Sequence, residues 1–225
     1  QKHNLVVIED VAETFLSKYK GRMVGTIGNL SSFSLQATKH ITAGEGGVVC
    51  TNDPVMADLV RKFSVLGYST VSATVGKITK DDIQNPNFER HVQLGYNYRM
   101  PEICAAVGLG QLEHAEELVQ RRIDSANLFI EAMKECEWLK PQVTPLDYVN
   151  SYWALAVRLV HPTLAWTTFR KKFMELGGNG IYAAWKLSYQ EPMFQERTRN
   201  FAGKEKILQA THEGGIPVYR DGLCP

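Results

Sequence analysis

The sequence predicts an α/β protein with a larger unit followed by a smaller α+β unit, on three observations. Residues 5–8 form a continuous apolar run that ends in Glu9-Asp10, as expected for a buried strand of a mostly parallel sheet with acids at its carboxyl end. Later segments carry apolar residues at helical spacing. After Pro141 and Pro145 the elements become shorter. At 225 residues, 44% of them hydrophobic, the chain is long enough to bury a sizeable core.

Short strands and turns are expected to follow the first strand. Residues 15–24 contain Lys20-Gly21, which indicates a hairpin or turn. Further strands are expected at residues 32–35 and 47–51, separated by a loop that ends in the glycine-rich run Gly44-Glu45-Gly46-Gly47. Ligands of open α/β sheets lie at the carboxyl ends of the strands, so this edge is the expected place of a site.

Two helices and a long loop are expected next. Asn52-Asp53-Pro54 predicts a helix that begins with an aspartate cap and a proline in its first turn and runs to about residue 66. Residues 68–90 are polar and lack apolar periodicity, which predicts a loop. From Pro101 to about residue 136, apolar residues recur every three or four positions and predict one long helix that crosses between domains.

The smaller unit is expected to begin after this helix. Its predicted elements are a strand at 152–160, a helix at 162–176 that ends in glycines, a strand near 180–182 and a helix at 204–213. We therefore divide the chain into residues 1–120, part of a larger domain, and residues 121–225, a linking helix with a small domain. The chain begins with Gln1 and stops at Pro225, and we expect it to be an internal piece of a longer protein.

Composition excludes several classes of function. Lys and Arg (25) nearly balance Asp and Glu (24), so nucleic acid and anionic membranes are not expected partners. The apolar stretches are too short to span a bilayer and no leader opens the chain, which predicts a cytoplasmic protein. The scattered cysteines indicate reduced thiols and no metal site; they are Cys50, Cys104, Cys136 and Cys224.

Lys39 is the most informative residue, because of the groups around it in the sequence. A lysine can form an imine with an aldehyde, an acid such as Asp10 can keep a pyridine ring protonated, and the Ser34 hydroxyl can bind a phosphate oxygen. Pyridoxal phosphate makes these three demands of a protein. Each residue also has a simpler interpretation: Lys39 as a surface lysine, Asp10 as a helix cap, and the glycine-rich run as a tight reversal into the next strand.

Several ordered motifs over residues 4–135 resemble the DegT/DnrJ/EryC1/StrS family of nucleotide-sugar aminotransferases. They are residues 7–10 with Ala12, Gly25-Thr26-Ile27-Gly28, Ser32-Phe33-Ser34, Thr38-Lys39, residues 44–47, and Gly95-Tyr96-Asn97-Tyr98-Arg99-Met100 followed by Glu102 and Ala105-Ala106. The resemblance implies an aspartate-aminotransferase-like fold, fold type I of the pyridoxal-phosphate enzymes. Its large domain has three α/β/α layers, and a smaller α+β domain follows. Part of the cofactor and sugar site is expected upstream of the first strand.

The resemblance also implies roles for individual residues. Lys39 matches the lysine that forms the internal aldimine and then moves the proton. Asp10 matches the partner of the pyridine nitrogen, Ser34 a phosphate ligand, and Glu13 a residue near the cofactor hydroxyl. Asn97 matches an asparagine that reaches the phosphate of the other subunit in a homodimer with shared active sites. The implied activity is transamination of a nucleotide-linked keto-deoxy sugar, with glutamate as the amino donor.

Two alternatives stay open. The family's aminotransferases usually carry glutamine or histidine at the place of Glu13, whereas related sugar 3-dehydratases carry glutamate. Those dehydratases have histidine in place of the lysine, and histidine moves protons but cannot form an imine, so Lys39 favours transamination. The second alternative is a regulatory relative that binds the cofactor without turnover. His40 is expected to support the site from behind, and a stripe in the smaller unit either lines a sugar-nucleotide site or belongs to the core; it comprises Trp185, Lys186, Tyr189 and residues 192–194.

Overall fold

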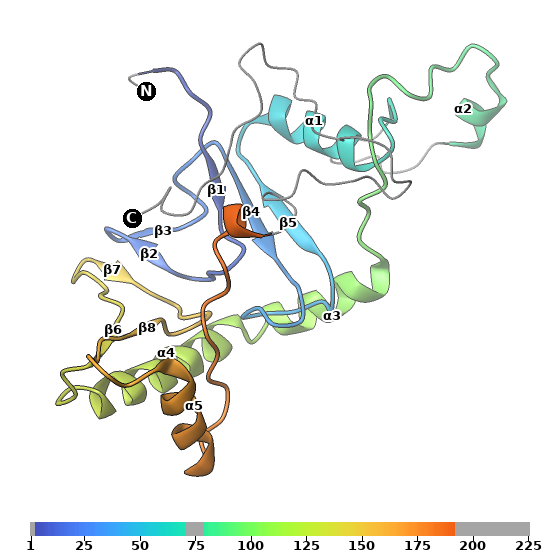
Figure 1. Ribbon diagram of the computed structural model, residues 1–225. Helices are drawn as coiled ribbons and strands as arrows, with labels where there is room; N and C mark the ends of the chain where they lie inside the picture. The colour runs from blue at the N-terminus through green and yellow to red at the C-terminus, as the bar shows by residue number, and fades with distance from the viewer. Residues whose placement is uncertain (1–2, 71–78, 192–225) are drawn as a thin grey trace. The chain divides into compact units, whose positions relative to one another are not determined.

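The computed structural model describes residues 3–70 and 79–191, and the chain divides into two compact units, residues 1–160 and 161–225. The strands of the first unit are β1 (Ile8–Asp10), β2 (Lys18–Tyr19), β3 (Arg22–Met23), β4 (Leu30–Ser34), β5 (Gly47–Cys50), β6 (Leu139–Pro141), β7 (Tyr148–Val149) and β8 (Val157–Leu159). Its helices are α1 (Pro54–Ser64), α2 (Lys80–Gln84), α3 (Glu102–Leu112) and α4 (Ala115–Ala132) (Figure 1). The predicted division at residue 120 falls inside α4 and stays a prediction.

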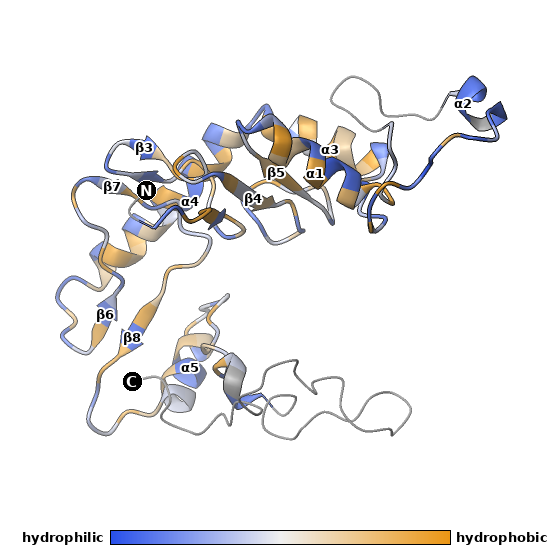
Figure 2. Cartoon of the chain, turned by 90° about the horizontal axis from the view of Figure 1, so that it is seen from above, coloured by the Kyte–Doolittle hydropathy of each residue, from blue (hydrophilic) through white to orange (hydrophobic). Residues whose placement is uncertain are grey.

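A three-stranded sheet of order β1-β4-β5 forms the centre of the first unit. Strands β1 and β4 run parallel, with Asp10 opposite Ser32, whereas β4 and β5 run antiparallel, so the expected mostly parallel sheet is mixed in the described residues. Figure 2 shows the apolar character of β5. The strand expected at 5–8 begins only at Ile8, and the prediction that it is buried is wrong: Leu5 is 71% and Ile8 68% exposed. Within the described residues β1 pairs with β4 alone, which leaves this end of the chain uncovered.

The hairpin predicted around Lys20-Gly21 is confirmed. Strands β2 and β3 pair antiparallel across these two residues, which have φ values of 48° and 76°. Two consecutive positive φ values are the requirement of the tight hairpin turn that matches the twist of the strands. Strand β2 also pairs with β7, so the hairpin joins the start of the chain to residues 148–149.

Helix α1 begins as predicted. The Asp53 carboxylate accepts hydrogen bonds from Val55 N (2.8 Å) and Met56 N (3.2 Å), which satisfies amides that the first turn leaves open. The long loop predicted after it contains a short helix, α2, which Thr79 caps. The sequence interpretation missed α2 because five residues show no apolar periodicity; residues 71–78 lie outside the described residues.

The single helix predicted from Pro101 to residue 136 is wrong, because the chain forms α3 and α4 with a break at Glu113-His114. His114 has φ −109° and ψ 12°, outside the helical region. Two glycines of low helix propensity, Gly108 and Gly110, lie in the second half of α3. The break is followed at once by Ala115, which is 5% exposed and packs in a core cluster with Leu35, Ile41 and Ala43.

The remaining elements are shorter than predicted. The strand expected at 152–160 is limited to β8, which pairs with β6. In the second unit, α5 (Trp166–Glu175) is followed by Gly177 with φ 87°, as the glycine signal predicts, and by a short helix η1 (Ser188–Gln190). Residues 180–182 form no strand in the described part of this unit, and the predicted helix at 204–213 lies outside it.

Among the described helices, none combines the length and the apolar composition that a bilayer crossing requires.

Candidate functional site

Four of the predicted site residues come from one edge of the β1-β4-β5 sheet. Strands β1 and β4 are parallel, so Asp10, at the end of β1, and Ser34, at the end of β4, share the carboxyl edge. Glu13 follows β1 and Lys39 lies in the loop after β4. The Lys39 Nζ atom lies 3.1 Å from Glu13 Oε1, so side chains 26 residues apart in sequence meet at this edge.

The Lys39 amine lies between a carboxylate and an aromatic ring. Its side chain is only 14% exposed, while that of its ion-pair partner Glu13 is 61% exposed. The Lys39 Nζ atom also lies 4.2 Å from the centre of the Trp153 ring, a cation–π geometry. Lys39 is therefore not the surface lysine of the simpler interpretation: its amine is shielded and oriented.

Asp10 and Ser34 offer polar atoms at the same edge. Asp10 is exposed, and its Oδ1 accepts a hydrogen bond from Ala12 N at 3.0 Å. The chain turns after Asp10 and does not enter a helix, so the helix-cap interpretation is wrong. Half-buried Ser34 accepts a hydrogen bond at Oγ from Gln36 N at 3.2 Å. A hydroxyl that accepts from its own loop keeps its proton free to donate to a ligand.

The glycine-rich run serves close packing of the backbone. Gly44 and Gly46 have φ values of 84° and 146°. A Cβ atom would lie 2.6 Å from Met100 Cε at Gly46 and 2.8 Å from Phe33 O at Gly47. These contacts support the tight reversal into β5 as the role of the run.

Asn97 lies apart from the other predicted residues. Its backbone forms an isolated antiparallel bridge with Val65, after α1, and its side chain is exposed. Within the described residues no hydrogen bond links it to Asp10, Glu13 or Lys39. A role for Asn97 at the Lys39 edge of the same chain therefore has no support here.

His40 supports the Lys39 turn from inside the protein. It is 5% exposed, and its Nε2 donates to Ser151 O at 3.0 Å, because a carbonyl oxygen can only accept. Burial lowers the pKa of His40 below its ordinary value of 6.5, the hydrogen bond to Ser151 opposes the shift, and the charges of Arg122 and Lys39 add to it. His40 is thus a neutral, buried anchor.

A buried hydroxyl group adds to this anchor. Ser151 is fully buried, and its Oγ accepts from Phe15 N at 3.2 Å and from Ser17 Oγ at 2.9 Å. Thr14 Oγ1 lies 3.0 Å from the same oxygen and donates to Ser17 Oγ. This cluster links the segment after β1 to Ser151, whose carbonyl oxygen also accepts the hydrogen bond from His40.

Sequence reasoning missed two residues that contact the lysine turn. Arg122, on α4, donates to Lys39 O at 3.1 Å, and Trp153 Nε1 donates to Thr38 O at 3.1 Å. These contacts bridge 83 and 115 residues of sequence. No local pattern signals them, and Trp153 was assigned to a predicted strand.

The stripe predicted in the second unit is only partly described. Trp185 is 90% exposed, so the core interpretation is wrong for this residue. The Tyr189 side chain and residues 192–194 lie outside the described residues.

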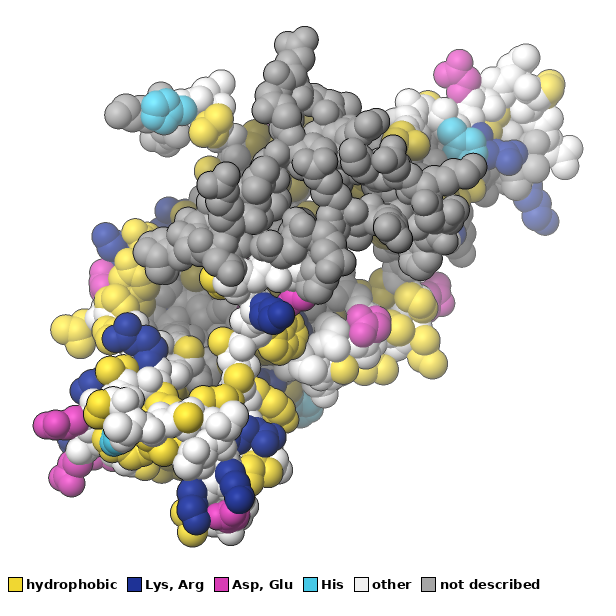
Figure 3. Space-filling view, in the orientation of Figure 1, with side chains coloured by type: hydrophobic (Ala, Val, Ile, Leu, Met, Phe, Trp, Pro, Cys, Tyr) yellow, Lys and Arg dark blue, Asp and Glu magenta, His cyan; other side chains and the backbone are white. Residues whose placement is uncertain are grey.

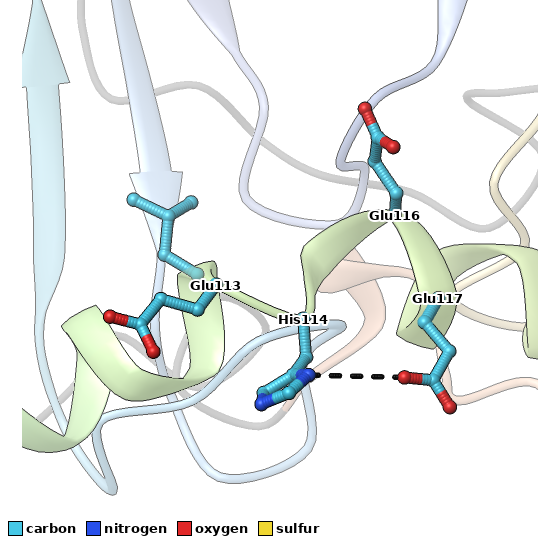
Figure 4. Close-up of a pocket in the computed structure, with 5 residues that line it drawn as sticks. Glu113, His114, Glu116 and Glu117 are labelled. Atoms are coloured by element: carbon cyan, nitrogen blue, oxygen red, sulfur yellow. Dashed lines mark ion pairs between the residues drawn. The ribbon is translucent and has the colours of Figure 1, made fainter.

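Other surface features are separate from the Lys39 edge. Figure 4 shows a hollow where α3 meets α4, lined by Leu112, Glu113, His114, Glu116 and Glu117. His114 Nδ1 lies 3.8 Å from Glu117 Oε2 there. On the face drawn in Figure 3, described side chains of both charge signs are interspersed with apolar ones, in keeping with the net charge of +1.

Comparison with known proteins identifies the class. The family model of the DegT/DnrJ/EryC1/StrS aminotransferase family matches residues 1–221. The chain is 37% identical over 157 residues to GDP-perosamine synthase of Escherichia coli O157:H7, covering 70% of this chain and 38% of that protein. It is 30% identical to the UDP-4-amino-4-deoxy-L-arabinose–oxoglutarate aminotransferase of Shewanella sediminis, covering 73% of this chain and 41% of that protein. The chain thus spans about two fifths of the length of these curated relatives.

Solved structures agree with this class. The aminotransferase PseC of Helicobacter pylori, involved in pseudaminic acid biosynthesis, matches with a TM-score of 0.68 and 27% identity over 86% of this chain and 49% of that one. A GDP-4-keto-6-deoxymannose-3-dehydratase, ColD, shares the fold with a TM-score of 0.67 at 20% identity, covering 79% of this chain and 46% of that one. The fold is thus that of the sugar aminotransferases. The chain belongs to the DegT/DnrJ/EryC1/StrS aminotransferase family.

Proposed function

We propose that the intact protein containing this chain uses pyridoxal phosphate to transfer an amino group from glutamate to a nucleotide-linked keto-deoxy sugar. The observation that carries the proposal is the placement of Lys39. Its shielded amine lies 3.1 Å from Glu13, at the sheet edge that also holds Asp10 and Ser34, in a chain of this family.

The residues present fit this cofactor. A largely shielded primary amine, an exposed carboxylate and a serine hydroxyl lie at one strand edge, and Asp10 Oδ2 has no hydrogen-bond partner among the described residues. Lys39, Asp10, Ser34 and Glu13 would hold the cofactor. When bound, pyridoxal phosphate supplies an aldehyde that reacts with amines and a ring that accepts electrons from carbon.

Each of these side chains has a chemical task. The Asp10 carboxylate would keep a proton on the ring nitrogen, and the Ser34 hydroxyl would donate to a phosphate oxygen. Lys39 Nζ would carry the proton between the carbon atoms that exchange it, as general base and then general acid. Glu13 would orient the amine through the contact seen here. In balance, glutamate and the keto sugar give 2-oxoglutarate and the amino sugar.

The names of the relatives support the proposed substrate class. One synthesises GDP-perosamine, and another is named as an aminotransferase that pairs a UDP-linked amino sugar with oxoglutarate. These names support a nucleotide-linked sugar as acceptor and the glutamate/2-oxoglutarate pair as donor.

The reaction can be tested in two stages with the cofactor-loaded intact protein. Glutamate without sugar should release one 2-oxoglutarate per site. Addition of GDP-4-keto-6-deoxymannose, or of a UDP-linked keto sugar, should then give an amino sugar by mass spectrometry. Lys39→Arg keeps the positive charge but cannot replace the amine in this chemistry, so both signals should disappear. Full turnover by the Lys39→Arg protein would contradict the proposal.

A nucleotide-sugar 3-dehydratase is the second candidate, favoured by Glu13 and by the shared fold of ColD. Such an enzyme removes a hydroxyl group from the sugar and forms no amino sugar. Lys39 favours transamination because it offers an amine where the dehydratases have histidine. Replacement of the sugar's hydroxyl by hydrogen, with glutamate oxidised to 2-oxoglutarate and ammonia and no nitrogen in the sugar, would establish the dehydratase.

The proposal includes a homodimer in which Asn97 of one copy serves the other copy's site. It is supported by the exposed Asn97 side chain, which lies apart from the Lys39 edge of its own chain. Inactive Lys39→Arg and Asn97→Ala proteins, unfolded together and refolded as hybrids, should regain activity, because one site of each hybrid dimer has both residues. Persistent inactivity of the hybrids would argue against a shared site.

A further inference from the structure

The loop that carries Lys39 is closed at its base by its own backbone. Leu35 N donates to Gly46 O at 2.9 Å and Ala43 N donates to Leu35 O at 2.8 Å. Within the turn, Lys39 N donates to Gln36 O at 2.9 Å. The carbonyl oxygens of Thr38 and Lys39 take their hydrogen bonds from outside this loop. The orientation of the lysine backbone is therefore fixed by other elements.

Arg122 donates two of these hydrogen bonds. Its Nη2 donates to Lys39 O at 3.1 Å and to Thr38 O at 3.3 Å, and its Nη1 donates to Trp153 O at 3.2 Å. Within residues 3–70 and 79–191, no carboxylate forms an ion pair with this half-buried guanidinium. Because the guanidinium is a planar fork of fixed geometry, these bonds set the turn and the Trp153 backbone relative to α4.

Trp153 contacts both the turn and the amine. Its Nε1 donates to Thr38 O at 3.1 Å, so that this carbonyl has two donors, and its ring lies 4.2 Å from Lys39 Nζ. The edge of the indole thus fixes the backbone, while its face defines one side of the space that the amine occupies. His40, bonded to Ser151 O, attaches the turn to the same segment a second time.

We propose that Arg122 and Trp153 are positioning residues that hold the turn at Thr38 and Lys39, and with it the direction of the Lys39 amine. The inference deepens the proposed function, since it depends on a chemical role for Lys39. A displacement of about 1 Å at a reacting group can lower the rate about a hundredfold. Arg122 and Trp153, together called the clamp, therefore matter for turnover without touching substrate.

The test measures the exposure of the amine directly and needs no cofactor. The cofactor-free intact protein is treated with formaldehyde and cyanoborohydride, and methylation of Lys39 is followed by peptide mass spectrometry. Arg122→Gln should raise the Lys39 rate about fivefold or more, since the loss of even one of the three Arg122 hydrogen bonds raises the population of a displaced turn by about that factor. Trp153→Phe keeps a ring face but loses the donor to Thr38, so its increase should be smaller.

Two controls make the result specific. Arg121→Gln removes the same charge from the same helix, but Arg121 is exposed and paired with Glu117, so the Lys39 rate should stay unchanged. Lys62, 23% exposed and paired with Asp58, reports general unfolding within each protein. The proposal is overturned if Arg122→Gln and Trp153→Phe both match Arg121→Gln, or if Lys62 accelerates as much as Lys39.

A second readout separates this inference from the proposed function. In the loaded protein, Arg122→Gln should lower kcat while the KM for sugar changes little. An unchanged kcat would count against the clamp. Borohydride labelling of a lysine other than Lys39 in the unmodified loaded protein contradicts the proposed function, whereas the methylation result of the cofactor-free protein stands independently of it.

Discussion

At the scale of single residues, buried polar groups hold the candidate site in place. His40 and Ser151 lie behind the Lys39 turn, and each makes hydrogen bonds to a different stretch of chain. Glu9 does the same for the loop before β4. Its partial burial opposes ionisation, but hydrogen bonds from Gly28, Gly25 and Ile27 together lower its carboxyl pKa. Removing one partner of such a hydrogen bond lowers stability by more than the intact bond contributes, because the buried group that remains has lost its contact with water and has no partner in its place.

His40 makes stability depend on pH in a defined direction. The pKa of His40 is lowered on folding, so below about pH 6.5 His40 binds a proton in the unfolded chain but not in the folded one. Stability should therefore fall as pH drops from 6.5 towards the folded pKa and change no further below it. His40→Gln keeps a donor for Ser151 O and removes the titration, so its urea midpoint should vary less over this window. Parallel pH profiles of the two proteins would refute this role.

Ser151→Ala should destabilise the intact protein. It leaves Phe15 N and two neighbouring hydroxyls without their buried partner, at a cost of about 1–3 kcal/mol in the free energy of unfolding. Ser125→Ala is the matched control, since exposed Ser125 donates only to Arg121 O on α4. Urea denaturation measures both. Equal, small losses would show that the hydroxyl cluster contributes little.

At the scale of elements, the features that depend on neighbouring residues could be predicted from the sequence, whereas those that depend on tertiary contacts could not. Asp53-Pro54 and Lys20-Gly21 predicted α1 and the β2-β3 hairpin, because caps and tight turns depend on residues a few positions apart. The helix break at His114 escaped prediction because the apolar spacing continues through it. The same limit applies to the site. Lys39, Glu13, Asp10 and Ser34 could be proposed from the sequence, and their role at the site stays a prediction. The clamp from Arg122 and Trp153 depends on tertiary contacts alone and could not be proposed.

Two glycines give opposite predictions for the same substitution. At Gly95, beside the turn after α1, an added Cβ would lie 2.3 Å from Gly67 N, so Gly95→Ala should cost about 1–3 kcal/mol through overpacking. At Gly110, in α3, an added Cβ would meet no atom within 4 Å apart from the adjoining residues and the backbone of the helix itself. Gly110→Ala should stabilise the protein by up to about 1 kcal/mol through helix propensity. Thermal unfolding of both variants checks the pair, and a stabilising Gly95→Ala would show that the close approach is not tight.

At the scale of the whole molecule, this chain presents apolar surface and a partial site. Large side chains on β1 and α3 are open to solvent, including Ile8 at 68% and Ile103 at 75% exposure. The chain also spans only about two fifths of its curated relatives. The family and its α/β fold could be predicted from ordered motifs, whereas the smaller α+β domain stays a prediction. The sugar could not be predicted, because no described contact distinguishes one nucleotide sugar from another. Activity is for these reasons a property to test on the intact protein.

The identity of the cofactor-bearing amine is the claim on which the rest depends. The intact protein, loaded with pyridoxal phosphate, is reduced with borohydride, digested and mapped by mass spectrometry. The account predicts a pyridoxyl group on Lys39 in the unmodified protein and its loss from this peptide in Lys39→Arg. A pyridoxyl group found on another lysine, with Lys39 unmodified, would contradict the account.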